Sequence, residues 1–178
     1  MTSLFSEIPI LTDGSITLKR VEHNDAEFLS SFVKNETIYK YLPTFLFEQQ
    51  YTDMQEMIHD LYNKCFAAKE SLILGIYQND NMCGLAEFYG YKAELQKTCI
   101  GYRLAPQFWG KSIATNTVAL MVDHLYSKTD IEIITASTMT ENKASARVLE
   151  KNGFIRTSVG VAEDWGFEKP VSADKWFR

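Results

Sequence analysis

Hydrophobic and polar residues follow two periods along this chain, one typical of strands and one typical of helices. An alternating run at 15–21, after an Asp13-Gly14 turn, predicts a strand. Asn24 or Asp25 is then expected to cap a short helix. A longer helix is predicted over 49–69, where apolar residues recur three and four positions apart.

Stronger strand patterns occupy the middle of the chain. Runs at 72–77 and 82–89 flank a polar turn at 78–81 and predict a hairpin. The next strand is expected at 98–104 and ends before Pro106, because proline cannot donate to a ladder. The later elements are expected to be a helix at 111–126, a strand at 131–136, a helix at 142–151 and strands at 154–161 and 175–177. Because hairpins come first and helix-linked strands later, the order predicts an α/β fold.

Composition supports one domain over residues 1–178. Apolar residues make up 46% of the chain, which is enough for a sizeable core, and no repeat or Pro/Gly/Ser linker divides it. These features exclude intrinsic disorder and small disulfide-stapled scaffolds.

Charge and special residues exclude further classes. The net charge of −5 disfavours a general nucleic-acid binder, so no nucleic-acid partner is expected. No stretch approaches 18 apolar residues and the N-terminus lacks a secretory signal pattern, so we expect no membrane partner and a cytoplasmic location. Cys65, Cys83 and Cys99 form no C-x-x-C pair. The three histidines show no metal spacing either, so no metal site is predicted.

The most informative segment is 104–115, where a strand leads through a short loop into a helix. Small residues at Gly110, Ser112 and Ala114 would let an anion approach the N–H groups of the first helical turn. Lys111 would add a positive charge at the rim. An ordinary strand-to-helix turn that needs a glycine explains the same pattern, and the pattern alone does not separate the two.

A phosphate-binding loop of nucleotide hydrolases is a rival interpretation of the same residues. Gly110-Lys111-Ser112 fits the end of G-x-x-x-x-G-K-[ST], but Ala105 occupies the position of the first glycine. Pro106 removes one N–H donor, and no second strand ending in Asp follows to hold magnesium. The nucleotide-enzyme hypothesis is therefore the weaker one.

Two segments together carry a family likeness. The first comprises Ile100-Gly-Tyr-Arg-Leu-Ala-Pro106 and Trp109-Gly-Lys-Ser-Ile-Ala-Thr115, a strand followed by a loop. The second runs from Thr140 to Phe154, where Asn142 opens a helix that ends in Gly-Phe. They resemble the GNAT superfamily of N-acetyltransferases, in the branch of the ribosomal-protein N-terminal and spermidine acetyltransferases. The likeness spans residues 97–154.

The resemblance implies a fold and a cofactor. The fold would be a mixed, mostly antiparallel twisted sheet with flanking helices, in which strands 98–104 and 131–136 splay apart around acetyl-coenzyme A. Backbone groups of Arg103 and Leu104 would pair with the pantetheine arm, and Asn142 would bond it from the other side. The pyrophosphate would lie on the loop residues Trp109, Gly110, Lys111, Ser112, Ile113, Ala114 and Thr115. No metal is implied.

The resemblance also implies candidates for catalysis. Ser145 matches a serine proposed as proton donor to the thiolate, although it would equally suit a helix-start hydrogen bond to Asn142. Leu149 stands where the spermidine enzymes carry a tyrosine acid, which argues against that mechanism. Glu87, on the strand before the loop, is the candidate base, although strand glutamates are often simply exposed. Ser112 stands where the family usually has glycine.

The predicted activity is acetyl transfer to a primary amine, which could be a protein N-terminus, a polyamine or another small amine. Loops near 20–50 and 160–174 would determine the acceptor, and Tyr89 and Tyr102 could line its pocket. By analogy alone, a homodimer is expected. A catalytically idle coenzyme A-binding or regulatory module is the main alternative, because of Ser112 and Leu149.

Overall fold

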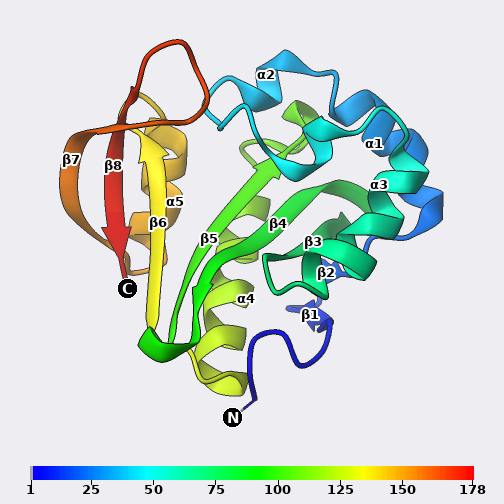
Figure 1. The fold of residues 1–178 in the computed structure, drawn as a ribbon, viewed down its shortest axis with the longest axis horizontal. Helices are drawn as coiled ribbons and strands as arrows, with labels where there is room; N and C mark the ends of the chain where they lie inside the picture. The colour runs from blue at the N-terminus through cyan, green and yellow to red at the C-terminus, as the bar shows by residue number, and fades with distance from the viewer. Residues whose placement is uncertain (1) are drawn as a thin grey trace.

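The computed structural model describes residues 2–178. They form one eight-stranded sheet with helices on both faces (Figure 1). The strand order is β1-β2-β3-β4-β5-β6-β8-β7, and only β5 and β6 pair in parallel among the strand pairs of this range. The strands are β1 Leu11–Thr12, β2 Thr17–Lys19, β3 Ser71–Gln78, β4 Asn81–Lys92, β5 Lys97–Leu104, β6 Ile133–Met139, β7 Ile155–Glu163 and β8 Val171–Phe177. The predicted α/β class with a mixed, mostly antiparallel sheet is confirmed.

The β3–β4 hairpin forms the centre of the sheet. Its register runs from Ser71 opposite Tyr89 to Gln78 opposite Asn81, so the predicted turn at 78–81 is present. Both strands are buried along most of their length, which explains why their sequences are nearly continuous apolar runs instead of alternating ones.

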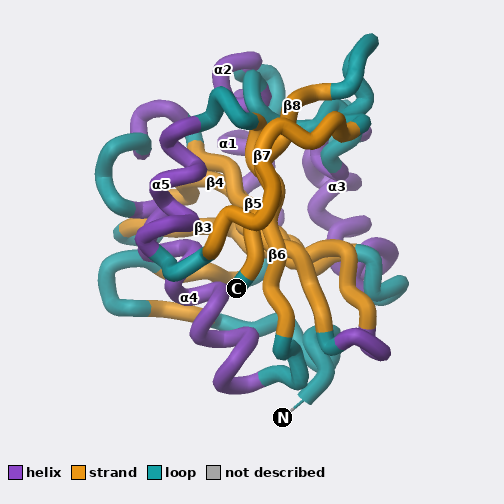
Figure 2. Tube along the Cα trace, turned by 90° about the vertical axis from the view of Figure 1, so that its left-hand side faces the viewer, coloured by secondary structure: helices purple, strands orange, loops and turns teal. Residues whose placement is uncertain are grey.

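Helices cover the two faces of the sheet at different places. The α-helices are α1 Ala26–Phe32, α2 Glu36–Tyr39, α3 Met54–Asp60, α4 Ile113–Lys128 and α5 Lys143–Lys151. Figure 2 shows α4 and α5 on one side of the sheet and α3 on the other. On the α4 side, Phe88, Ile100 and Leu104 belong to one core cluster. On the α1 and α3 side, Ile73 and Leu85 belong to a second.

The helix predicted over 49–69 is wrong as one continuous element. The structure has a 3-10 turn at Phe47–Gln50, then α3, then a π-helical segment at Leu61–Phe66. Asp53 starts α3, because its carboxylate accepts hydrogen bonds from the N–H groups of Gln55 and Glu56. Single π turns of this kind occur where tertiary contacts outweigh the regular helical ladder.

The buried hydroxyl of Tyr62 is one such contact in the π-helical segment. It accepts a hydrogen bond from Val21 N–H at 2.7 Å and donates one to the carbonyl of Ile73 at 3.0 Å. It thereby joins the helix to β3 and to the segment after β2.

Other elements deviate from the prediction only at their ends. The strand expected at 15–21 is reduced to β2, and a 3-10 turn at His23–Asp25 precedes α1. The strand β1, the helix α2 and the 3-10 turns Ala93–Leu95 and Pro106–Phe108 were not expected. Within residues 2–178, no helix combines the length and apolar character needed to cross a bilayer.

Candidate active site

The strands β5 and β6 pair only at their beginnings and then separate. Their parallel register covers Lys97 with Ile133 to Cys99 with Thr135, while β6 continues against β8 as far as Met139 opposite Ala173. The last five residues of β5 therefore have β4 as a neighbour but no strand on the β6 side. The predicted splay of these two strands is present, and the gap between them is the frame of the candidate site.

Backbone alternation decides which residues of β5 face the gap. The carbonyl of Gln96 accepts a hydrogen bond from Ile133 N–H on the β6 side, whereas Ala105 N–H donates to Cys83 on the β4 side. Because the period is two, the polar backbone groups of Tyr102 and Leu104 point to the gap, and those of Arg103 point to β4. Of the two residues predicted to pair with a pantetheine arm, only Leu104 is oriented for it.

The loop after β5 brings unbonded N–H groups to the mouth of the gap. Among residues 2–178, no acceptor bonds to the backbone N–H groups of residues 110–115, which lead into the first turn of the 16-residue helix α4. Gly110 has φ +70 and open space where a Cβ would lie. These donors lie together at the positive end of the helix, which is the arrangement on which the prediction of an anion cradle depends.

Two residues of the loop depart from a glycine-rich cradle. Ser112 takes the left-handed conformation at φ 61 and ψ 1 without using its hydroxyl as a cap. Trp109 is 48% exposed, and its indole N–H donates to the carbonyl of Leu104 at 2.8 Å. This bond fastens the loop to the end of β5 and leaves the N–H of Leu104 for a ligand.

The start of α5 lies across the gap from β5. Asn142 is the N-cap, and its side-chain oxygen accepts from Ser145 N–H at 3.1 Å. The amide NH2 of Asn142 therefore stays available as a donor. The hydroxyl of Tyr102 donates to Ser145 Oγ at 3.3 Å, so the candidate proton donor Ser145 is joined directly to β5.

The other face of the sheet holds the candidate base Glu87 in a buried ion cluster. Arg103 is 4% exposed and binds Glu48 through Nε and Nη2, both at 2.6 Å, and Glu87 through Nη1 at 2.9 Å. Glu87 also accepts a hydrogen bond from the Ser71 hydroxyl at 2.8 Å. Burial disfavours the charge of Arg103, but the two carboxylates outweigh it and raise the pKa of the guanidinium. Glu87 is thus oriented by two donors rather than freely exposed.

Tyr89 and Tyr102, both considered for the acceptor pocket, lie on opposite faces of the sheet. Tyr102 packs against the core cluster on the α4 side, whereas Tyr89 shares the face of Glu87. Burial raises the pKa of Tyr89, and the charges of Cys99, Glu87 and Glu163 act in the same direction. The acceptor-side candidates are therefore Tyr89, Glu87 and Glu163.

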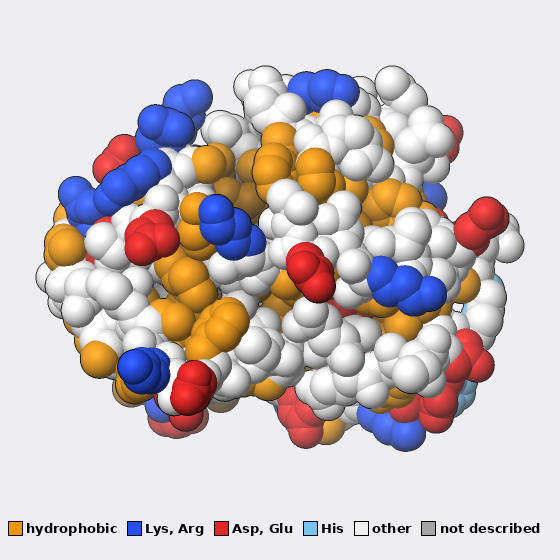
Figure 3. Space-filling model, turned by 90° about the horizontal axis from the view of Figure 1, so that it is seen from above, with side chains coloured by type: hydrophobic (Ala, Val, Ile, Leu, Met, Phe, Trp, Pro, Cys, Tyr) orange, Lys and Arg blue, Asp and Glu red, His pale blue; other side chains and the backbone are white. Residues whose placement is uncertain are grey.

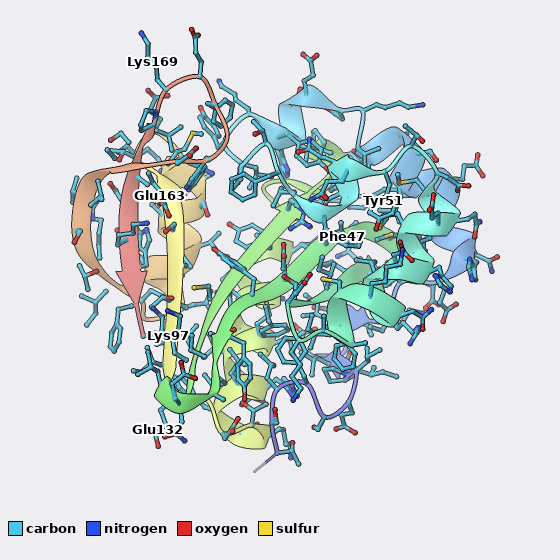
Figure 4. All side chains as sticks on the ribbon, in the orientation of Figure 1. Phe47, Tyr51, Lys97, Glu132, Glu163 and Lys169 are labelled. Carbon is cyan, nitrogen blue, oxygen red and sulfur yellow. The ribbon has the colours of Figure 1, made fainter. Side chains whose placement is uncertain are left out.

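Two loops meet above the gap and join the two halves of the sheet. Thr44, after α2, donates its backbone N–H to the carbonyl of Trp165 at 2.8 Å and its hydroxyl to the same oxygen at 3.2 Å. Figure 1 shows the β7–β8 loop reaching this segment, and Figure 4 places Glu163 and Phe47 on either side of the divide. We call this connection the Thr44–Trp165 bridge. It connects the regions 20–50 and 160–174 that were predicted to determine the acceptor.

Seen from above, the molecule is hollowed and apolar side chains form a discontinuous band across the middle of the face (Figure 3). A cavity of about 410 Å³ lies beside the bridge, between the α1–α2 region and Phe167 of the β7–β8 loop. Isolated acidic and basic side chains border the band. This face is therefore a mixed surface of apolar walls and single charges.

The remaining chemistry-bearing residues form no second centre. Among residues 2–178, no group of three His, Cys, Asp or Glu side chains is arranged to hold a metal ion. His124 is buried at the α4 core face, in edge contact with Phe88, and burial lowers its pKa. The sequence interpretation missed Glu48 and Tyr39, whose hydroxyl donates to Glu48 at 3.0 Å, because the segment that carries them has no clear period.

The comparison with known families agrees with this geometry. The family model described as "Acetyltransferase (GNAT) domain" matches residues 15–155 of the chain. The chain belongs to the GNAT acetyltransferase family. Its classification as an N-acetyltransferase, expected from the two sequence segments, is therefore confirmed.

Two curated relatives of this GNAT protein come from Bacillus. It is 28% identical over 148 residues to the uncharacterized N-acetyltransferase p20 of Bacillus licheniformis, covering 79% of this chain and 82% of the relative. It is 26% identical over 155 residues to the uncharacterized N-acetyltransferase YoaA of Bacillus subtilis (strain 168), covering 85% of each.

Solved structures show the same fold. RimL, a ribosomal L7/L12 alpha-N-protein acetyltransferase in complex with coenzyme A, matches with TM-score 0.81 and 18% identity over 96% of this chain and 97% of that one. The spermidine N-acetyltransferase from Vibrio cholerae, in complex with coenzyme A and spermine, matches with TM-score 0.76 and 20% identity over 93% and 96%. Both of those structures contain coenzyme A.

Proposed function

We propose that this GNAT protein transfers the acetyl group of acetyl-coenzyme A to a primary amine that enters between the bridge loops. The observation that carries the proposal is the run of six unbonded N–H groups at 110–115 beside the gap between β5 and β6. An anionic cofactor with an extended arm suits both features, because the cradle binds phosphate and the open side of β5 binds a backbone-like chain.

Each cofactor-binding residue has a proposed contact. The N–H groups of residues 110–115 would hold the pyrophosphate, with Lys111 as a cation at the rim and Trp109 fixing the loop. The N–H of Leu104 would bond the pantetheine arm, and the amide NH2 of Asn142 would bond it from the α5 side. Arg103 would contribute indirectly, since its side chain holds β5 to the acceptor-side segment.

The cofactor supplies an acetyl thioester. During transfer a C–N bond forms, the C–S bond breaks, one proton leaves the nitrogen and one proton reaches the sulfur. A backbone N–H of β5 directed at the carbonyl oxygen would stabilise its developing charge by about 3 kcal/mol. Holding amine and thioester side by side would supply much of the remaining acceleration.

Ser145 and Glu87 are proposed for the two proton positions. Ser145 lies on the α5 side of the gap, where the sulfur would leave, and donates a hydrogen bond to the thiolate, which then takes up its proton from solvent. Glu87 lies on the opposite face, where the amine arrives. Its carboxylate accepts only two hydrogen bonds of about four possible, so it retains the capacity to accept a proton through water.

The acceptor is proposed to be cationic in its resting form. Two carboxylates against one guanidinium leave the Glu48–Arg103–Glu87 cluster with an excess negative charge, whereas Glu163 is paired with Lys175. A protein N-terminus, as for RimL, or a polyamine, as for the Vibrio enzyme, carries the complementary charge. The three free cysteines, two of them buried, support the proposed cytoplasmic location.

The deciding experiment is calorimetric titration with acetyl-coenzyme A, beside coenzyme A and ATP–magnesium. We expect micromolar binding of both coenzyme A forms, which Gly110→Asp abolishes because a carboxylate then occupies the cradle. Gly110→Ala is the matched control, since it introduces the backbone strain at φ +70 without the charge. Affinity for ATP–magnesium alone would favour the nucleotide-enzyme hypothesis.

Turnover separates the enzyme from an idle binding module. Wild-type protein would be assayed with acetyl-coenzyme A against N-terminal peptides, spermidine and small monoamines, following release of the free thiol. Release that depends on one amine class supports the proposal. Binding of acetyl-coenzyme A with no amine-dependent release across the panel would show that the chain is a coenzyme A-binding module.

A further inference from the structure

The Tyr102 hydroxyl has no role in the binding scheme above. Its ring packs against the core cluster on the α4 side, a position that phenylalanine would fill equally well. Its hydroxyl nevertheless reaches 43 residues along the chain to Ser145 Oγ, 3.3 Å away. The contact spans the gap from β5 to the first turn of α5.

The Tyr102 hydroxyl is the donor of this hydrogen bond and Ser145 Oγ is the acceptor. Burial raises the pKa of Tyr102 to about 12, although the bond to Ser145 works in the opposite direction. The phenol therefore keeps its proton at neutral pH and remains able to donate. Because Ser145 Oγ accepts this hydrogen bond, its own proton is left for another partner.

Ser145 has no acceptor for that proton among residues 2–178. Its backbone N–H is held by Asn142 Oδ1 at 3.1 Å, which fixes the residue on the helix. Because one lone pair of Ser145 Oγ accepts from Tyr102, the O–H of Ser145 is directed away from Tyr102. A hydroxyl that accepts a hydrogen bond also becomes a stronger donor, because neighbouring hydrogen bonds polarise one another.

We propose that Tyr102 is a positioning residue that directs the Ser145 hydroxyl proton to the sulfur of coenzyme A. The proposal rests on the function proposed above. Tyr102 gives up no proton: it donates a hydrogen bond to Ser145, and Ser145 donates one to the sulfur. The chain of two hydroxyls stabilises the thiolate form over the thiol.

The pKa of the coenzyme A thiol in its complex with the protein tests this directly, without turnover. It is read from thiolate absorbance or from the rate of alkylation as a function of pH. We expect the bound thiol to have a pKa about one unit below that of free coenzyme A, since a hydrogen bond to the charged form favours it. Ser145→Ala and Tyr102→Phe should each remove most of this decrease.

A double-mutant cycle distinguishes positioning from direct action. If Tyr102 acts through Ser145, Tyr102→Phe has no further effect on thiol pKa or kcat in the Ser145→Ala background. We expect either single variant to lower kcat ten- to a hundredfold with little change in the Kd for coenzyme A. A further loss in the double variant, or an unchanged thiol pKa in Tyr102→Phe, would overturn the proposal.

The chain supplies a matched control in a second tyrosine–serine pair. Tyr91 and Ser3 lie with their oxygens 3.3 Å apart, away from the gap, so Tyr91→Phe should change neither thiol pKa nor kcat. If Tyr102→Phe folds poorly by thermal melting, difluorotyrosine at position 102 provides the opposite change, a stronger donor that should lower the thiol pKa further. Absence of coenzyme A binding in the wild type would refute the proposed function itself, a result distinct from all of these.

Discussion

Gly166 lies against Thr44 so closely that a Cβ at position 166 would come within 2.1 Å of Thr44 Oγ1. Gly166 also has φ +81, which L side chains rarely adopt. The close contact follows from the Thr44–Trp165 bridge, in which the carbonyl of Trp165 accepts hydrogen bonds from both the N–H and the hydroxyl of Thr44. The glycine is thus required by the close approach of the loops and not by its own turn alone.

Gly166→Ala is therefore expected to open the bridge and loosen the acceptor side. KM for the amine should rise several-fold, while the Kd for acetyl-coenzyme A stays unchanged because the cradle lies elsewhere. Steady-state kinetics and calorimetry measure the two. Gly14→Ala is the control, since Gly14 has φ +86 but open space around its Cβ position. Equal effects of the two variants would show that backbone strain alone, and not the bridge, is responsible.

The Arg103 cluster is expected to dominate the stability of the acceptor side. Arg103→Met leaves Glu48 and Glu87 buried without a counter-charge, which should lower the free energy of unfolding by about 3–5 kcal/mol. The triple variant Arg103→Met/Glu48→Gln/Glu87→Gln removes the uncompensated charge and should recover part of the loss. Urea unfolding measures both. A single variant as stable as the wild type would contradict the electrostatic argument.

The sequence was sufficient for the elements that depend on local pattern. The hairpin around residues 78–81 and the loop before α4 were predicted because apolar runs, turn residues and a family likeness coincide there. The Glu48–Arg103 pair was not predictable, since it joins residues 55 positions apart and Glu48 lies in a segment with no period. The orientation of Tyr102 was not predictable either. It follows from strand alternation only when it is known that the Gln96 carbonyl bonds to Ile133 of β6.

Ser112 allows the cradle to be tested by a variant that should increase coenzyme A affinity instead of decreasing it. A non-glycine residue at φ 61 is strained by about 1–2 kcal/mol, and in the proposed complex its hydroxymethyl group would be close to the phosphate. Ser112→Gly should increase coenzyme A affinity several-fold in calorimetry. Because glycine also gains entropy in the unfolded chain, the melting temperature should change little. Weaker binding by Ser112→Gly would indicate that the hydroxyl itself contacts the cofactor.

Asp60 should give the protein a pH-dependent stability. Hydrogen bonds from Lys64 and His59 lower its pKa to about 2, against the opposing effect of burial, and Tyr51 adds another. Because the folded pKa lies below the usual 3.8, the stabilisation is complete above that value and is lost as pH falls toward 2. Asp60→Asn should flatten the stability curve in this window in urea unfolding. Asp80→Asn, in an exposed turn, should leave the curve unchanged.

Glu87→Gln separates a base from a residue that only balances Arg103. As the base, Glu87 would take the proton of the amine, so its loss should lower kcat/KM for the amine by about a hundredfold or more. The single side-chain oxygen of glutamine can still accept from Arg103, while its NH2 would donate to the Ser71 hydroxyl, and the residue carries no charge. Glu48→Gln is the matched control, because it neutralises the other carboxylate of the same cluster. Equal losses of kcat/KM in the two variants would assign Glu87 to the structure of the site and leave the proton to solvent.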